Sequence, residues 1–343
     1  MADLLSVRGL EVEFVTDQGV ARVLDRISLR IAPGEVVGLV GESGCGKTTL
    51  ARSILGILPA GAARVRGGEI QFKGRDLLRE DPRVVNEEVR GRAITVIPQD
   101  PFTSFNPLFT VGAQVMDLMK WKSPHRAVAA RTQRRWPAVL HRYPRTRYRA
   151  DRAAVLEALR AVHLPEPERA LGRLPHEFSG GQRQRLMIAM ALLPRPDLVI
   201  ADEPTTALDV TIQAQILRLL RQLVKERGVS VLFTTHDLGT AYEICDRVVV
   251  MYAGQEMEAA PTGVFFDRPA HPYTRRLLES LPSPGGEIRD IPGEVPSLIA
   301  PPSGCRFHPR CDYATTECRA DRPAERAVGG QHRVHCFHPL GSA

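Results

Sequence analysis

Gly41-Glu42-Ser43-Gly44-Cys45-Gly46-Lys47-Thr48-Thr49 is the stretch of sequence that decides the fold. It fits the pattern G-x-x-x-x-G-K-[ST] and follows an apolar run, residues 36–40, that is typical of a buried strand. In this setting the glycines let backbone N–H groups turn toward a phosphate, Lys47 reaches the terminal phosphates, and the Thr48 hydroxyl can ligate Mg²⁺. Residues 49–58 have a helical pattern, so the anion would lie at a helix N-terminus. The stretch predicts a phosphate-binding loop; a Gly-rich turn that binds nothing is the alternative.

Size and composition narrow the class of protein. A chain of 343 residues, 43% hydrophobic and 25% charged, predicts one large α/β unit with one or two smaller parts and argues against a disordered or fibrous protein. No uncharged apolar run approaches the roughly 18 to 20 residues needed to span a bilayer, and the N-terminus lacks a basic start followed by an apolar core. We therefore expect a cytoplasmic protein. The net charge of +7 is compatible with nucleic acid or an anionic membrane surface, and is a weak signal.

The segments around the loop predict further strands. Residues 4–14 and 20–31 alternate apolar and polar side chains on either side of a Gly-containing turn, which is typical of two paired strands. Phe14 in the first of them could stack on an adenine ring or pack inward as an ordinary strand residue. Residues 67–72 and 94–97 predict two more strands, and the second of these leads to Gln99.

From about residue 102 to residue 177 the pattern is helical and is broken by Pro and Gly, which indicates a separate helical subdomain. Within it, residues 122–152 are rich in Arg and poor in acidic residues. This stretch is either a solvated basic face or a contact with anionic lipid headgroups or an acidic partner.

In the second half of the chain, polar residues stand at the ends of the predicted strands and at the starts of the predicted helices. Ser179 precedes two glycines and an apolar-periodic helix, so we expect it to be a helix N-cap. Residues 198–203 predict a buried strand ending in Asp202 and Glu203, a carboxylate pair that suits a cation or a catalytic task. Asp209 precedes an amphipathic helix over about 210–227, and His236 follows a strand over 230–235. Residues 247–251 are expected to be the last strand of this unit.

In this order the motifs resemble the ATP-binding subunit of an ABC transporter. The resemblance rests on the phosphate loop Gly41 to Thr48, a Q-loop Gln99, a signature Ser179-Gly180-Gly181-Gln182, a Walker B pair Asp202 and Glu203, a D-loop Ala207-Leu208-Asp209 and a switch His236. A closer resemblance, to oligopeptide and dipeptide importer ATPases, rests on His271-Pro272-Tyr273-Thr274 and on a tail from Gly304 through Cys305, Cys311 and Cys318 to Cys336. The Arg-rich stretch looks longer than is usual for that family, and Asp312 stands where a proline commonly follows the second tail cysteine.

The resemblance implies an α/β fold with a P-loop NTPase (RecA-like) core and an antiparallel β subdomain, formed by residues 1–101 and 178–260. It implies a helical subdomain of residues 102–177 that faces membrane subunits, and a Cys-rich C-terminal extension of residues 261–343. The function it implies is ATP hydrolysis that powers import of di- and oligopeptides. An importer ATPase for nickel or another small solute, or a non-transport ABC ATPase acting on nucleic acid, is the alternative.

The resemblance also implies a mechanism and partners. Two ATPase subunits would bind head to tail, each ATP lying between the phosphate loop of one, Gly41 to Thr49, and the signature of the other. Lys47 would bind the β- and γ-phosphates, Thr48 and Asp202 would hold Mg²⁺ with help from Gln99, Glu203 would polarise water and His236 would contact the γ-phosphate. The expected partners are a second homologous ATPase, in a heterodimer, two membrane-spanning permease subunits and an extracytoplasmic solute-binding protein, with no nucleic acid. The chain would lie peripherally on the cytoplasmic face of the membrane.

The tail cysteines indicate a metal or cluster site. Four of the six cysteines, Cys305, Cys311, Cys318 and Cys336, lie in the last 40 residues, and a reducing cytosol argues against disulfides between them. Their spacing, x₅, x₆ and x₁₇, lacks the tight C-x₂-C pairs of most zinc modules. Four thiolates can bind an iron–sulfur cluster. The resemblance favours [4Fe-4S]; Zn²⁺ and unliganded thiols are the alternatives. His308, His335 and His338 could substitute as ligands, but the bystander interpretation is favoured for them.

Overall fold

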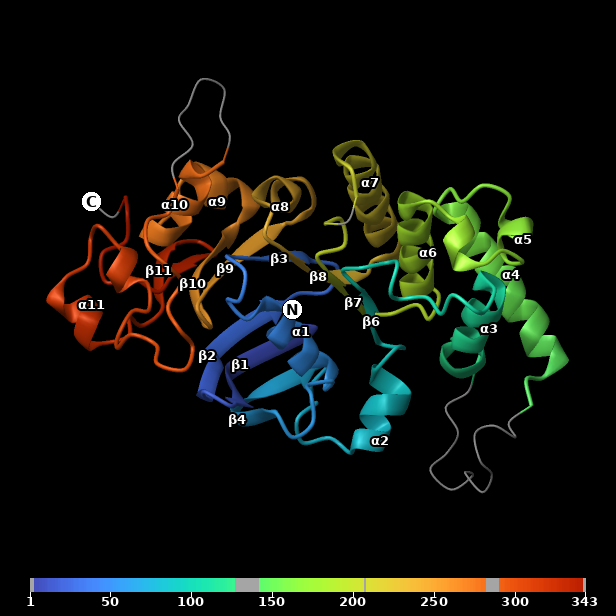
Figure 1. The fold of residues 1–343 in the computed structure, drawn as a ribbon, viewed down its shortest axis with the longest axis horizontal. Helices are drawn as coiled ribbons and strands as arrows, with labels where there is room; N and C mark the ends of the chain where they lie inside the picture. Colours follow the sequence, from blue (N-terminus) through green and yellow to red (C-terminus); the bar gives the residue numbers. More distant parts are fainter. Residues whose placement is uncertain (1–2, 127–141, 207, 282–289, 342–343) are drawn as a thin grey trace. The chain divides into compact units, whose positions relative to one another are not determined.

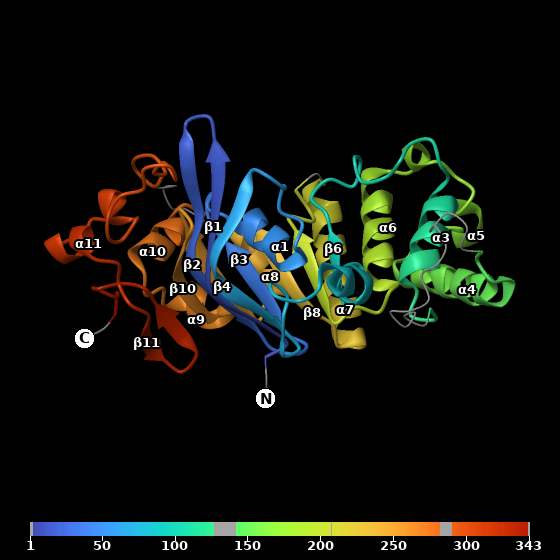
Figure 2. The same cartoon turned by 90° about the horizontal axis from the view of Figure 1, so that it is seen from below.

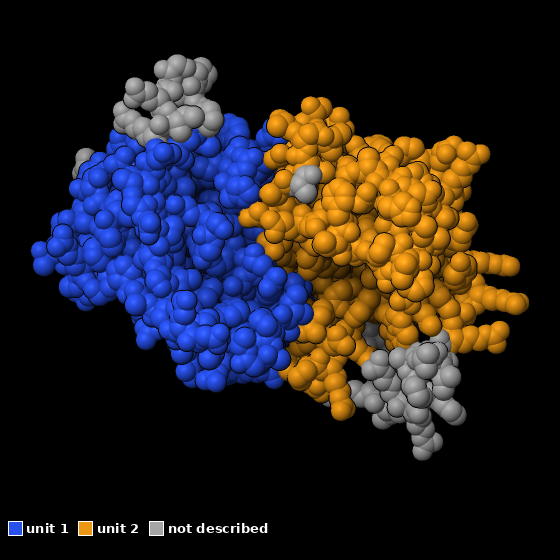
Figure 3. All heavy atoms as spheres, viewed as in Figure 1, with its two compact units in different colours: residues 1–79, 232–343 blue, residues 80–231 orange. Residues whose placement is uncertain are grey.

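The computed structural model describes residues 3–126, 142–206, 208–281 and 290–341. The chain forms two compact units, the first of residues 1–79 and 232–343 and the second of residues 80–231 (Figure 3). The division expected from the sequence, with a core of residues 1–101 and 178–260, stays a prediction.

The first unit begins with an antiparallel sheet whose strand order is β2-β1-β4-β5 (Figure 2). Its bounds are β1 Leu5–Thr16, β2 Gly19–Ile31, β4 Ala63–Phe72 and β5 Arg75–Asp76. Leu5 on β1 pairs with Ile31 on β2 and with Phe72 on β4, and all three side chains are buried. The paired strands predicted from the alternating pattern are thus confirmed, and the inward-facing residues form one side of the core.

A second sheet in the same unit carries the phosphate loop. β3, Val36–Val40, pairs in parallel with β9, Arg247–Tyr252, and every residue of both strands is buried. Within this unit the strand order is β11-β12-β10-β9-β3-β8. The bounds are β8 Ser230–Thr235, which begins at the end of the second unit, β10 Gln255–Pro261, β11 Arg326–Gly329 and β12 His332–Val334.

The prediction that residues 247–251 form the last strand is wrong. Ala253 and Gly254 both have positive φ, 45° and 82°, and turn the chain back so that β10 pairs with β9 in antiparallel fashion. The sequence pattern did not indicate β10 because Glu256 and Glu258 interrupt its apolar residues, although both are buried in the fold. The C-terminal extension then continues the sheet, since β12 pairs with β10.

The helices of the first unit follow from local signals. α1, Lys47–Leu55, begins within the phosphate loop, and Gly56 caps its C-terminus with φ of 63°, a left-handed conformation that glycine adopts without strain. The remaining helical segments are α8 Leu238–Ile244, α9 Thr262–Asp267, α10 Pro272–Glu279, the 3₁₀ turn η4 His308–Arg310 and α11 Thr316–Ala320, with α1 spanning Lys47–Leu55.

The second unit combines two parallel strands with a group of helices. β6, Ile94–Ile97, pairs with β7, Leu198–Asp202, and the predicted bounds of β6 are confirmed. Figure 1 shows α3, α4, α5 and α6 grouped together, as their contacts require. The helical bounds are α2 Pro82–Val84, the π-turn η1 Val85–Val89, α3 Val111–Lys122, α4 Arg145–Ala161, α5 Pro167–Ala170, the 3₁₀ turn η3 Pro175–Glu177, α6 Gly180–Leu192 and α7 Val210–Arg227.

The helical character predicted for residues 102–177 is confirmed where the structure describes them. The middle of the Arg-rich stretch, residues 127–141, lies outside the described residues, as does Ala207 of the D-loop. Among the helices that are described, none combines the length and the apolarity needed to cross a bilayer.

Candidate nucleotide-binding site

The phosphate loop joins β3 to α1, and three of its glycines have backbone conformations that residues with a Cβ seldom adopt. Gly41, Gly44 and Gly46 have φ of 150°, 79° and 107°. A Cβ on Gly41 would lie 2.1 Å from the carbonyl oxygen of Met251, and one on Gly46 would lie 2.8 Å from the Leu24 side chain. Since backbone atoms cannot move aside cheaply, the loop is fixed in a shape that no other residue type permits at these positions.

Lys47 points back over the loop. Its Nζ donates to the carbonyl oxygen of Gly41 at 2.7 Å and lies 3.4 Å from that of Glu42, and the residue is 6% exposed. Cys45 is buried beside it, and burial raises the pKa of its thiol above the ordinary value. The loop carbonyls therefore hold the ammonium group in a position where the oxygens of an anionic ligand would replace them as acceptors. Cys45 packs as a neutral side chain.

Two side chains of the C-terminal extension bind the phosphate loop directly. Arg310 Nη1 and Nη2 donate to the Glu42 carboxylate at 2.9 and 3.2 Å, and the Glu42 backbone N–H donates to the Tyr273 hydroxyl at 3.1 Å. Arg310 is 8% exposed and also donates to the Tyr252 hydroxyl at 3.2 Å. Burial raises the pKa of Tyr273 far above the ordinary value, so its hydroxyl stays protonated. Local sequence patterns do not indicate this role for either residue, since each contacts a loop that is more than 200 residues away in the chain.

In the second unit the predicted catalytic side chains of Gln99 and Glu203 meet. Gln99 Nε2 donates to Glu203 Oε2 at 3.2 Å, and Thr206 Oγ1 donates to the same oxygen at 3.2 Å. Glu203 follows Asp202, the last residue of β7, and has a φ of 46°, which a residue with a Cβ seldom adopts. A strained, hydrogen-bonded carboxylate at a strand end is typical of a functional side chain.

The signature residues begin α6 in the way that the sequence predicted. The Ser179 hydroxyl accepts from the Gln182 N–H at 3.3 Å, and Gln182 Oε1 accepts from the Ser179 N–H at 3.1 Å, which is a capping box. A Cβ on Gly181 would lie 2.8 Å from the Ile212 side chain of α7, so this position also requires glycine. Gly180 and Gly181 thus present the first N–H groups of the helix, which have no partner within it.

The remaining predicted site residues, Asp209, His236 and Phe14, lie on three different elements. Asp209 is the N-cap of α7, since its side chain accepts from the Ile212 N–H at 3.0 Å. His236 follows β8 directly and is exposed. Phe14 is half-buried on β1, where it pairs with Ala21 and Ala63, so both interpretations of its ring stay open. The phosphate loop, Phe14 and His236 belong to the first unit, and the other predicted ATP-site residues belong to the second.

The four tail cysteines line one pocket in the first unit. Cys305, Cys311, Cys318 and Cys336 share it with the aromatic ring of Phe307 and with His271, His308 and His338 among others. Burial, reinforced by the neighbouring cysteines, raises the pKa of Cys305 to about 11 and that of Cys336 to about 12. None of them forms a disulfide. The four cysteines thus share one pocket, which His335 does not line, and the metal site expected on them stays a prediction.

Comparisons with known proteins agree with these features. The family described as "ABC transporter" matches residues 24–206, and the family described as "Oligopeptide/dipeptide transporter, C-terminal region" matches residues 257–318. A probable peptide ABC transporter ATP-binding protein of Sinorhizobium fredii is 46% identical over 97% of this chain and 94% of its own. The dipeptide transport ATP-binding protein of Bacillus subtilis is 41% identical over 98% and 95%.

A solved structure is similar over the cassette. The dimeric ATP-binding cassette MJ0796, in a post-hydrolysis state bound to ADP and Pi, has a TM-score of 0.60 and 25% identity, and the match covers 75% of this chain and 98% of that one. The likeness supports a P-loop NTPase cassette fold with a further segment outside the match.

Proposed function

The chain belongs to the ABC transporter ATP-binding proteins of the oligopeptide/dipeptide type, and we propose that it is the ATP-hydrolysing subunit of a peptide importer. One observation carries the assignment. The oligopeptide/dipeptide C-terminal region matches residues 257–318 in a chain that resembles peptide-transport ATPases over nearly its whole length. Cargo itself is selected by other subunits.

The cargo is tested by purifying the complex from native membranes and identifying the small molecules released from its solute-binding subunit. We expect di- and oligopeptides. Recovery of nickel or another small solute without peptide would contradict the peptide assignment and favour the alternative importer. Co-purification of nucleic acid without membrane subunits would contradict transport altogether.

The first unit supplies the groups that bind the triphosphate. Lys47 would exchange its loop carbonyls for the β- and γ-phosphate oxygens, and the turned N–H groups between Gly41 and Thr49 would surround the phosphates. Thr48 of this unit and, from the second unit, Asp202 and Gln99 are the proposed Mg²⁺ ligands, because hydroxyl, carboxylate and amide oxygens suit this ion. When bound, the ion neutralises charge on the phosphates. His236 would contact the γ-phosphate.

The second unit supplies the group that activates water. Glu203 would accept a proton from the attacking water, and its contacts with Gln99 and Thr206 hold the carboxylate in one orientation. Gln99 also precedes the helical region of residues 102–177, which we propose faces two permease subunits. A change at Gln99 on hydrolysis would then reach that region directly along the chain.

The signature completes the ATP site of a second ATPase subunit. The N-terminus of α6, with the N–H groups of Gly180 and Gly181, is suited to a γ-phosphate held by a partner, and Asp209 would lie at the same interface. The similar cassette of known structure is dimeric, which supports this arrangement. We propose a heterodimer with a homologous ATPase, an extracytoplasmic solute-binding protein as a further partner, and a peripheral position on the cytoplasmic face of the membrane.

We propose that the cysteine pocket holds a [4Fe-4S] cluster, with Zn²⁺ as the alternative. Four thiols, the full ligand set of such a cluster, line one pocket that also contains aromatic side chains. The raised pKa values of Cys305 and Cys336 mean that these thiols are protonated until a metal displaces the protons. The cluster would join segments that are distant in sequence, with no redox step in hydrolysis.

Anaerobic purification should give brown protein with broad absorbance near about 400 nm and stoichiometric sulfide. The Cys318→Ser variant should lose this absorbance, and Cys245→Ser, which alters a buried cysteine outside the pocket, should keep it. A colourless wild-type protein that contains zinc would overturn the cluster assignment.

A further inference from the structure

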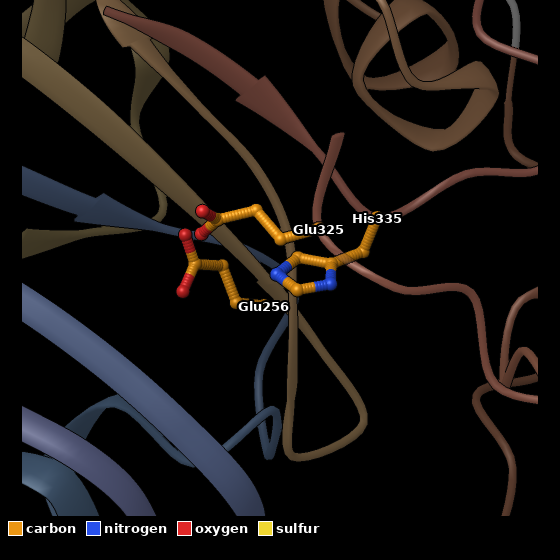
Figure 4. A group of neighbouring side chains, drawn as sticks. All are labelled: Glu256, Glu325 and His335. Atoms are coloured by element: carbon orange, nitrogen blue, oxygen red, sulfur yellow. The ribbon is translucent and has the colours of Figure 1, made fainter. Parts of the chain in front are cut away.

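A second group of metal-ligating side chains lies in the first unit, apart from the cysteine pocket. Glu256, Glu325 and His335 each offer one ligand atom, and these three atoms all lie within 4.8 Å of one another (Figure 4). Glu256 is on β10, Glu325 immediately precedes β11, and His335 immediately follows β12. The two ends of the β11–β12 hairpin therefore meet β10 at this point, and neither end residue lines the cysteine pocket.

Glu256 carries a buried carboxylate, whose charged form requires a nearby positive charge. The residue is 4% exposed, and its carboxylate lies within 4.8 Å of ligand atoms of Glu325 and His335. Burial is the main cause that raises its pKa to about 7, and the charge of Glu325 adds to it. An isolated buried carboxylate is strongly unfavourable, so this one either keeps a proton or faces a cation.

The nearby arginines do not meet that need. Arg333, Arg247 and Arg322 all act on Glu256 through space, but each is paired with a different carboxylate. Arg333 Nη1 lies 3.4 Å from Glu325 Oε2. Arg247 Nε lies 2.8 Å from Glu35 Oε1, and Arg322 Nη1 lies 3.4 Å from Asp25 Oδ1. Each of these arginines thus forms its ion pair with a carboxylate other than that of Glu256.

His335 is oriented as a metal ligand would be. Its Nδ1 lies 3.4 Å from the carbonyl oxygen of Pro323, and its Nε2 side faces the two carboxylates (Figure 4). Metal-binding histidines usually donate a hydrogen bond from one ring N–H to a carbonyl or carboxylate and bind the cation through the other nitrogen. His335 has this arrangement, with its second nitrogen directed at the two carboxylates.

We propose that Glu256, Glu325 and His335 bind a divalent transition-metal cation such as Mn²⁺ or Zn²⁺, which fastens the β11–β12 hairpin to β10. Two carboxylate oxygens and one imidazole nitrogen suit this class of ion, with water completing the coordination. The ion gives the buried Glu256 its counter-charge and joins the C-terminal extension to the sheet that carries the phosphate loop. The site is independent of the bound nucleotide.

Mn²⁺ is the appropriate probe, because thiolates in the cysteine pocket prefer softer ions. The full chain, freed of divalent metal and nucleotide, is titrated with Mn²⁺ alone while the electron paramagnetic resonance signal of free Mn²⁺ is followed. We expect one bound ion per chain. Glu256→Gln should weaken binding by at least about tenfold, as should Glu325→Gln, which alters an exposed side chain.

Three controls decide the location of the ion. Glu317→Gln removes an exposed carboxylate of α11, Cys311→Ser removes a pocket thiol, and Asp202→Asn removes the proposed Mg²⁺ ligand. All three should bind Mn²⁺ as the wild type does. Failure of the wild type to bind Mn²⁺, unchanged binding by both glutamine variants, or loss of binding in Asp202→Asn would overturn the proposal.

Discussion

Replacing Glu203 with Gln should lower the turnover number of ATP hydrolysis by about 10²- to 10⁴-fold, the range that a positioned general base contributes. The substitution keeps the size of the side chain and its ability to accept from Gln99 and Thr206, both now 3.2 Å from Oε2. It removes the negative charge that would take the proton of the attacking water. ATP affinity should stay within about threefold of the wild type, because the residues proposed to bind the phosphates are unchanged.

Steady-state hydrolysis and equilibrium binding of a fluorescent ATP analogue measure the two effects separately. Glu157→Gln, which alters an exposed carboxylate on α4 of the same unit, is the matched control and should hydrolyse ATP at the wild-type rate. Turnover that is unchanged in Glu203→Gln would remove Glu203 from its proposed role.

Replacing Arg310 with Gln should weaken ATP binding about 30-fold. This corresponds to roughly 2 kcal/mol, the lower part of the range for hydrogen bonds between charged groups. The guanidinium donates to both oxygens of Glu42, so its loss frees a carboxylate within the loop that must accept a triphosphate. The effect should appear in the Kd of ATP and in KM, with kcat changed little, because Arg310 positions the loop and contacts no reacting atom.

A double-mutant cycle separates this role from simple loss of structure. Adding Glu42→Gln to Arg310→Gln should recover part of the affinity, since the unpaired carboxylate is then gone. Arg319→Gln, an exposed arginine of the extension, should bind ATP normally. Absorbance near about 400 nm, the expected mark of the proposed cluster, must be recorded in each variant because Cys311 adjoins Arg310. Unchanged Kd in Arg310→Gln, with that absorbance equal to the wild type's, would contradict the positioning role.

The sequence predicted those elements that local patterns determine. β6 and β8 have the predicted bounds, and so does α7, because each is a continuous apolar or amphipathic run between clear end signals. The Ser179 cap followed from residue type and position alone. Gln99 and Glu203 were predicted as functional, and the structure brings them together.

The features that were missed depend on contacts between distant segments. Arg310 and Glu42 are 268 residues apart, and neither local pattern nor charge indicates that they pair. β10 was missed because its two glutamates gave it a polar appearance, and their burial follows from strands on both sides. The same tertiary contacts bring Glu325 and His335 to Glu256. Local sequence patterns do not specify such long-range pairing.

If a second ATPase subunit completes the ATP site, as we propose, ATP must bring two chains together, and the mass of the hydrolysis-deficient chain in solution measures this. Glu203→Gln is mixed with the homologous ATPase of its complex, carrying the equivalent substitution, and studied by size-exclusion chromatography with light scattering. Without nucleotide we expect the mass of single chains, and with ATP the mass of a one-to-one pair. Chains that bind ATP with wild-type affinity but keep the single-chain mass, together or separately, would contradict the account.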